Sequence, residues 1–178
     1  MLKWLRKEDW SIKICCPTTE ITSMGGLTIK AQEMLEESHK ADAVIIGSGS
    51  MTREIVNNTS LMNRIRLDPR RQIIGAQCSG ALVLAKLGML KDVPACTDSM
   101  TKPWIEESGI EVLNQPLFAK QNVATAGGCL ASAYLTAWII TKLGDLKAAE
   151  KALHYFAPVG EKEEFVEKAL KNISSFLV

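Results

Sequence analysis

The sequence has few of the residues from which most metal and nucleotide sites are built. Its 178 residues include two histidines, His39 and His154, and five cysteines, no two of which form a CxxC pair. The HExxH, GxxxxGKS/T and EF-hand patterns, which set metal ligands or phosphate-binding amides at fixed spacing, do not occur. We therefore expect no metal and no cofactor.

Strong charge of one sign and long apolar runs are missing as well. The formal net charge of +1 gives no basic face for nucleic acid. No apolar run approaches the roughly 20 residues of a membrane span, and the first ten residues, "MLKWLRKEDW", contain no signal-peptide core. The odd, scattered cysteines favour reduced thiols. We expect a cytoplasmic protein with neither a membrane nor a nucleic-acid partner.

Strand-like and helix-like segments alternate along the whole sequence. The apolar runs 41–47 and 71–77 are typical of buried parallel strands. Further strands are expected over 10–16, over 93–98 and as two pieces within 110–128, and the helices over 51–67, 81–90, 129–143, 145–155 and 161–176. This alternation predicts an α/β fold with a mostly parallel sheet, and the length fits a single domain over residues 1–178.

Three loops rich in small residues follow strand ends: "GSGS" from Gly47, "CSG" from Cys78 and "GGC" from residue 127. Ligands of open parallel sheets bind outside the carboxyl ends of the strands. Cys78 lies between a strand and a helix, as in a nucleophile elbow. The helix N-terminus should lower the pKa of its thiol. The N–H of Ser79, helped by that of Gly49, would then bind an oxyanion.

The segment around Cys78 alone leaves a second interpretation open, because free cysteine often serves as a small buried hydrophobe. Cys129 also precedes an apolar helix, but we expect it to begin a core helix. We interpret the remaining cysteines as structural: Cys15, Cys16 and Cys96. Neither histidine adjoins Cys78 in the sequence, so a Cys-His dyad stays an open possibility.

Three blocks of the sequence resemble the ThiJ/PfpI superfamily: "ADAVIIGSGSMTRE", "IIGAQCSGALVLAKLGML" and "NVATAGGCLASAYLTAWII". The resemblance covers almost the whole chain. The resemblance implies a class I glutamine amidotransferase-like fold, which is a flavodoxin-like three-layer sandwich. The Cys-Ser-Gly elbow is similar to the Cys-Thr-Gly elbow of the isocyanide hydratase-like branch.

The resemblance also implies roles for individual residues. Cys78 matches the nucleophile, and Gly49 and Ser79 match the two residues that supply oxyanion N–H groups. Asp98 stands where several relatives carry a histidine. We expect the family's first strand to be lacking, together with the acid that hydrogen-bonds to the nucleophilic sulfur; Glu20 and Asp42 do not match that motif.

The resemblance implies an enzyme that uses Cys78 on a small electrophilic substrate, as a homodimer. The most specific version is an isocyanide hydratase-like hydro-lyase, in which the thiolate attacks the isocyanide carbon. Glyoxalase-like and amidase-like activities use the same nucleophile. Two non-enzymatic alternatives stay open: a catalytically impaired or redox-responsive regulatory protein, and a ligand-sensing domain.

Overall fold

The protein is built around a central four-stranded sheet. A computed structural model describes residues 1–2 and 10–177. The strands are arranged in the order β5 (Ala43–Ile46), β6 (Ile73–Gln77), β8 (Val123–Ala126) and β7 (Leu117–Lys120). The first three are parallel, and β7 returns antiparallel to β8. The sheet therefore has the parallel character that the apolar runs predict.

Strand β6 lies in the middle of this sheet and is buried on both faces. The side chain of Ile73 joins one core cluster and that of Ile74 joins the other. At Gly75 a Cβ atom would lie only 3.0 Å from Leu135 Cδ1, so this glycine lets helix α5 approach the strand. The carboxyl end of β6 is consequently held between two packed layers.

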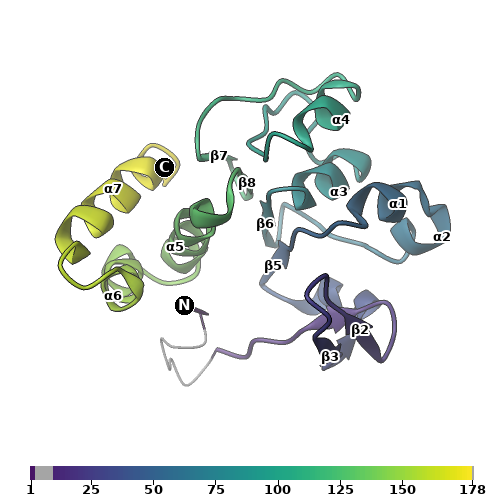
Figure 1. The fold of residues 1–178 in the computed structure, drawn as a ribbon, viewed down its shortest axis with the longest axis horizontal. Helices are drawn as coiled ribbons and strands as arrows, with labels where there is room; N and C mark the ends of the chain where they lie inside the picture. Colours follow the sequence, from purple (N-terminus) through teal and green to yellow (C-terminus); the bar gives the residue numbers. More distant parts are fainter. Residues whose placement is uncertain (3–9, 178) are drawn as a thin grey trace.

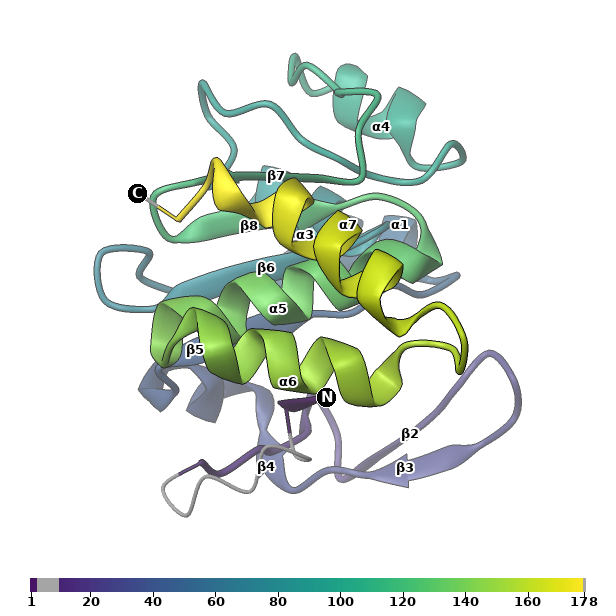
Figure 2. The same cartoon turned by 90° about the vertical axis from the view of Figure 1, so that its left-hand side faces the viewer.

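Helices cover both faces of the sheet and complete three layers (Figures 1 and 2). One face carries α5 (Ser132–Leu143), α6 (Leu146–Phe156) and α7 (Lys162–Ser174), packed around the fully buried Trp138. The short helix η3 (Cys129–Ala131) leads directly into α5. The other face carries the shorter helices α1 (Thr52–Asn57), α2 (Thr59–Met62), α3 (Gly80–Lys86) and α4 (Lys102–Glu106). The predicted α/β sandwich is confirmed.

A small N-terminal subregion lies beyond β5 (Figure 1). It contains β1 (Cys15–Cys16) parallel to β4 (Glu33–Met34), the hairpin of β2 (Glu20–Thr22) and β3 (Thr28–Lys30), and η2 (Leu35–Lys40). Arg64 ties it to the main body, because its Nη2 donates to Pro17 O at 2.9 Å and its Nε to Glu36 Oε1 at 2.5 Å. Within the described residues, β5 is paired with a strand on one side only, that of β6.

Several elements are shorter than the sequence predicts. The strand expected over 10–16 is reduced to β1, and the strand expected over 93–98 is a single bridge between Ala95 and Val112. The helix expected over 51–67 is divided into α1 and α2, because the side chain of Asn58 caps a new helix start by accepting from Leu61 N at 3.0 Å. The segment before Trp10 resembles the end of the family's first helix, and its residues 3–9 lie outside the described residues.

Candidate active site

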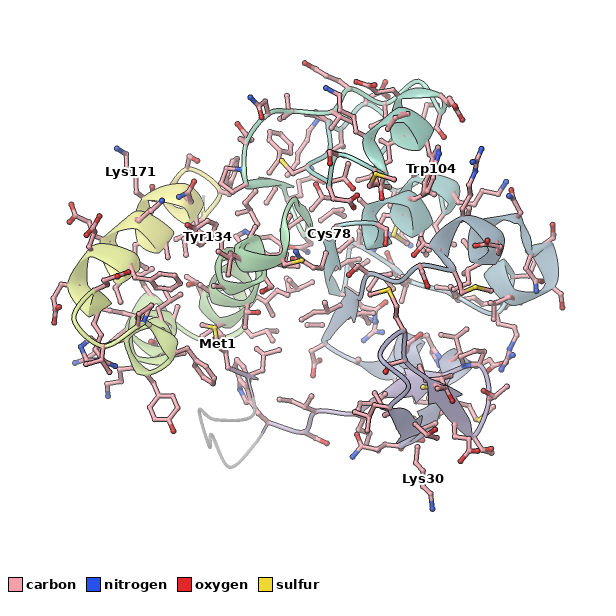
Figure 3. All side chains as sticks on the ribbon, viewed as in Figure 1. Met1, Lys30, Cys78, Trp104, Tyr134 and Lys171 are labelled. Carbon is pink, nitrogen blue, oxygen red and sulfur yellow. The ribbon has the colours of Figure 1, made fainter. Side chains whose placement is uncertain are left out.

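Cys78 lies at the turn between β6 and α3 and has an unusual backbone conformation. Its φ angle is +46°, in the left-handed region that costs an L-residue about 1–2 kcal/mol. Hydrogen bonds hold the turn, since Cys78 N donates to Ala126 O at 2.7 Å and Cys78 O accepts from Thr97 Oγ1 at 2.9 Å. The strand, the strained turn and the helix have the order of a nucleophile elbow. Figure 3 shows Cys78 at the centre of the molecule.

The backbones of the loops around this turn are in close contact at two glycines. A Cβ atom at Gly80 would lie 2.5 Å from Ile46 O and 2.9 Å from Gly47 O. A Cβ atom at Gly127 would collide with the carbonyl oxygen of Thr97. These glycines therefore allow the loops after β5, β6 and β8 to converge on Cys78.

The Cys78 thiol is almost fully buried, with 5% of the residue exposed. Burial raises the pKa of the thiol above its usual value, and this effect outweighs hydrogen bonds from the Gln77 side chain and the Gly128 backbone, which lower the pKa. The expectation that the helix N-terminus lowers the pKa of Cys78 is therefore wrong in direction. The turn that presents the thiol also removes it from water.

Gln77 is the side chain in direct contact with the sulfur, and sequence reasoning missed it. Its Nε2 donates to Cys78 Sγ at 3.1 Å and to Gly128 O at 2.8 Å. A carbonyl oxygen can only accept, so the second bond fixes which end of the amide faces the sulfur. The other end, Oε1, is buried without a hydrogen-bond partner in the described part of the chain. An unused acceptor thus lies on the amide that contacts the thiol.

Gly49 and Ser79 lie in direct contact. The amide of Gly49 donates to Ser79 Oγ at 3.1 Å. Thr52, which the sequence did not single out, completes the cluster: its Oγ1 lies 2.9 Å from Ser79 Oγ and donates to Gly49 O at 2.7 Å. The N–H of Gly49 is therefore engaged by a hydroxyl, while the N–H of Ser79 has no acceptor among the described residues.

No carboxylate of the described residues hydrogen-bonds to Cys78 Sγ. Asp98 instead holds the turn before α4, since its Oδ1 accepts from Met100 N and Thr101 N, each at 3.0 Å. Its charge acts on Cys78 only as a minor cause that raises the pKa of the thiol. The histidines lie elsewhere, His39 in η2 and His154 in α6.

A comparison with protein families decides what the chain is related to. The family model described as "DJ-1/PfpI family" matches residues 1–142. The chain belongs to the DJ-1/PfpI family. No curated protein sequence matches it.

Solved structures of DJ-1/PfpI proteins share the fold at low sequence identity. A cysteine-to-alanine mutant of a DJ-1 superfamily protein from Salmonella typhimurium is 21% identical, with a TM-score of 0.71 over 88% of this chain and 89% of that one. A ThiJ/PfpI family protein from Pseudomonas syringae is 17% identical, with a TM-score of 0.68 over 92% and 76%. DJ-1 of Schizosaccharomyces pombe is 18% identical, with a TM-score of 0.53 over 85% and 77%. These likenesses establish the fold.

Two surface hollows lie away from the elbow. One, of about 560 Å³, is lined by residues of α2, by Arg66 in the segment that follows α2, and by Lys86 at the end of α3. The other, of about 310 Å³, lies between α6 and α7. Neither is lined by Cys78. Residues 1–2 and 10–177 contain no cluster of histidine, cysteine and carboxylate side chains that could hold a metal ion. They also contain no helix long and apolar enough to cross a membrane.

Proposed function

We propose that this DJ-1/PfpI protein is a cysteine-dependent hydratase or hydrolase in which Cys78 attacks a small electrophilic carbon. The observation that carries the proposal is the Cys78 turn, where a left-handed residue at a strand end receives a hydrogen bond on its sulfur from Gln77 Nε2. A strained backbone and a hydrogen-bonded thiol together are typical of a reactive residue rather than of a core-filling one.

The chemistry follows from the atoms around the sulfur. The raised pKa keeps most of the Cys78 thiol protonated near neutral pH. Donors at the sulfur, from Gln77 and the Gly128 backbone, stabilise the thiolate once the proton leaves. The thiolate then adds to the electrophilic carbon, and the N–H of Ser79, which has no acceptor among the described residues, would stabilise negative charge that develops on the substrate.

An isocyanide is the substrate class that we propose first. The thiolate adds to its terminal carbon, and this carbon takes up the proton that left the thiol, which gives a thioimidate. Water then adds to the same carbon, and departure of the thiol leaves an N-formamide. Gly49 and Thr52 support this step indirectly, by holding Ser79 through its hydroxyl. A direct contact of the Gly49 amide with substrate would require the Ser79 hydroxyl to give up its 3.1 Å bond.

Turnover with a small panel of electrophiles tests the proposal. We expect hydration of an isocyanide, with methylglyoxal and a simple amide as the competing substrates for glyoxalase-like and amidase-like activity. Cys78→Ser should reduce turnover to background, because an alcohol is a far weaker nucleophile than a thiolate. Cys96→Ser is the matched control, since Cys96 is fully buried and its pKa is raised to about 12 by burial. Equal turnover in Cys78→Ser and the wild type would remove Cys78 from the mechanism.

We also propose that the protein acts as a homodimer, as the family resemblance implies. Light scattering after size-exclusion chromatography should give a mass twice that of the 19.5 kDa chain. A mass of one chain across the accessible concentration range would contradict this.

A further inference from the structure

We propose that Cys78 and Cys129 form a redox pair, in which a hydroperoxide oxidises Cys78 and Cys129 closes an intramolecular disulfide. The proposal rests on the reactive Cys78 thiol of the proposed function. It does not require that the protein turn over an isocyanide or any other electrophilic substrate.

The sheet brings the two cysteines together. Gln77 and Ala126 are opposite each other in the parallel pair of β6 and β8. The chain leaves both strands at the same edge, and Cys78 N still donates to Ala126 O at 2.7 Å. The peptide of Gly128 then reaches the sulfur, because its oxygen accepts from the same Gln77 nitrogen that contacts Cys78 Sγ. Cys129 is the next residue.

The two thiols have complementary surroundings. Cys78 is buried, whereas Cys129 is exposed at the start of η3. Cys129 is close enough to Cys78 for its charge to raise the pKa of the Cys78 thiol. Cys96 lies fully buried, and Cys15 and Cys16 belong to β1 in the N-terminal subregion. Cys129 is therefore the one thiol both close to Cys78 and open to solvent.

The loop before Cys129 leaves room for the rearrangement that a disulfide needs. Disulfides require Cα atoms about 4.4–6.8 Å apart. Gly128 has a φ angle of +83° and no atom within 4 Å of the place where a Cβ would stand. Gly128 thus has open space around it and the backbone freedom of glycine, whereas Gly127 stays packed against Thr97.

The unused acceptor on Gln77 fits the oxidised intermediate. A sulfenic acid on Cys78 carries an O–H group that a thiolate lacks, and this group needs an acceptor. Gln77 Oε1 is a buried acceptor without a partner in the described residues, on the same amide whose Nε2 contacts the sulfur. The amide can therefore contact the sulfur through Nε2 and accept from the sulfenic hydroxyl through Oε1.

The chemistry balances with the hydroperoxide as the only added reactant. The Cys78 thiolate attacks the terminal oxygen, the O–O bond breaks, and the products are Cys78 sulfenic acid and an alcohol that takes up the thiol proton. The Cys129 sulfur then attacks the sulfenic sulfur, the S–O bond breaks, and the hydroxyl leaves as water with the Cys129 proton. Two thiols lose two electrons, and the peroxide gains them.

Peptide mapping by mass spectrometry tests the pair in the full-length protein. Trypsin leaves Cys78 in peptide 72–86 and Cys129 in peptide 121–142, whereas Cys96 lies in peptide 92–120 and the remaining two cysteines in 14–30. After treatment with hydrogen peroxide at an equimolar dose, we expect the first two peptides to be linked, and to separate on reduction with dithiothreitol. Free peptides with Cys78 as sulfinic acid, or a link to Cys96, would overturn the proposal.

Two variants separate the resolving role from simple oxidation. In Cys129→Ser, Cys78 should proceed to sulfinic acid, while Cys96→Ser should form the disulfide as the wild type does. Identical Cys78 oxidation in the wild type and Cys129→Ser would overturn the proposal, as would a peroxide-induced link between two chains through Cys129 on a non-reducing gel.

Because turnover of the reduced protein is measured separately, an absent disulfide with intact turnover refutes only the redox pair. An absent turnover with an intact disulfide refutes only the proposed function.

Discussion

Replacing Gln77 by leucine tests how the buried thiol of Cys78 is activated. The change removes the hydrogen bond from Nε2 to Cys78 Sγ, which is 3.1 Å long. A hydrogen bond to a charged group is worth about 1.5–3 kcal/mol. Because iodoacetamide reacts with the thiolate, losing this bond should slow alkylation of Cys78 by about 10- to 100-fold near neutral pH.

The same substitution should leave the fold nearly unchanged. Gln77→Leu loses the bond to Gly128 O, worth about 1 kcal/mol. Gly128 is exposed, so water can replace that donor. The substitution also removes Oε1, a buried acceptor without a partner in the described residues, whose desolvation costs about 1–3 kcal/mol. The two effects oppose each other, and we expect the free energy of unfolding to change by about 1 kcal/mol or less.

The assay is the rate of Cys78 alkylation as a function of pH, followed by mass spectrometry of peptide 72–86. The pKa of Cys78 is raised by burial, so the wild-type rate should climb through the alkaline range, and the Gln77→Leu curve should lie at higher pH. Gln115→Leu is the control, because Gln115 Nε2 makes a similar bond, to Leu117 O at 2.9 Å, away from the sulfur. If Gln77→Leu and wild type alkylate at equal rates across the pH range, Gln77 does not stabilise the thiolate.

Two further substitutions test the surroundings of Cys78. Asp98→Asn should raise the alkylation rate of Cys78 slightly, because the Asp98 charge raises the pKa of the thiol; a slower rate would indicate the catalytic dyad that the structure does not show. Gly80→Ala should cost about 1–3 kcal/mol of stability, since the new Cβ would lie 2.5 Å from Ile46 O. Gly47→Ala, where no atom lies within 4 Å of the new Cβ, is its control in thermal unfolding.

The sheet and the elbow could be predicted because their signals are local in the sequence. The apolar runs that became β5 and β6 are too short for helices, and small residues follow both strands. The small pair after Cys78, followed by an apolar helical segment, marks a sharp turn between strand and helix. The apolar runs and the turn after Cys78 can each be read within about ten residues, because the backbone preference and the burial of those residues favour the same local structure.

The surroundings of the sulfur could not be predicted in the same way. Neighbouring side chains on a strand point to opposite faces, so Gln77 should point away from Cys78. The left-handed turn at Cys78 changes this direction and brings amide and sulfur within 3.1 Å. Thr52 reaches Ser79 from a different loop. The pKa of Cys78 depends on burial by the whole fold, so the helix N-terminus alone predicts it in the wrong direction.

The left-handed backbone at residue 78 means that keeping a cysteine there costs the protein thermostability. Glycine adopts a φ angle of +46° without the penalty of about 1–2 kcal/mol that an L-side chain meets there. A laboratory selection for heat resistance alone should therefore favour Cys78→Gly over Cys78→Ala, and the survivors would lose the thiol. Retention of the thiol would show that packing of its buried side chain outweighs the relief of the backbone.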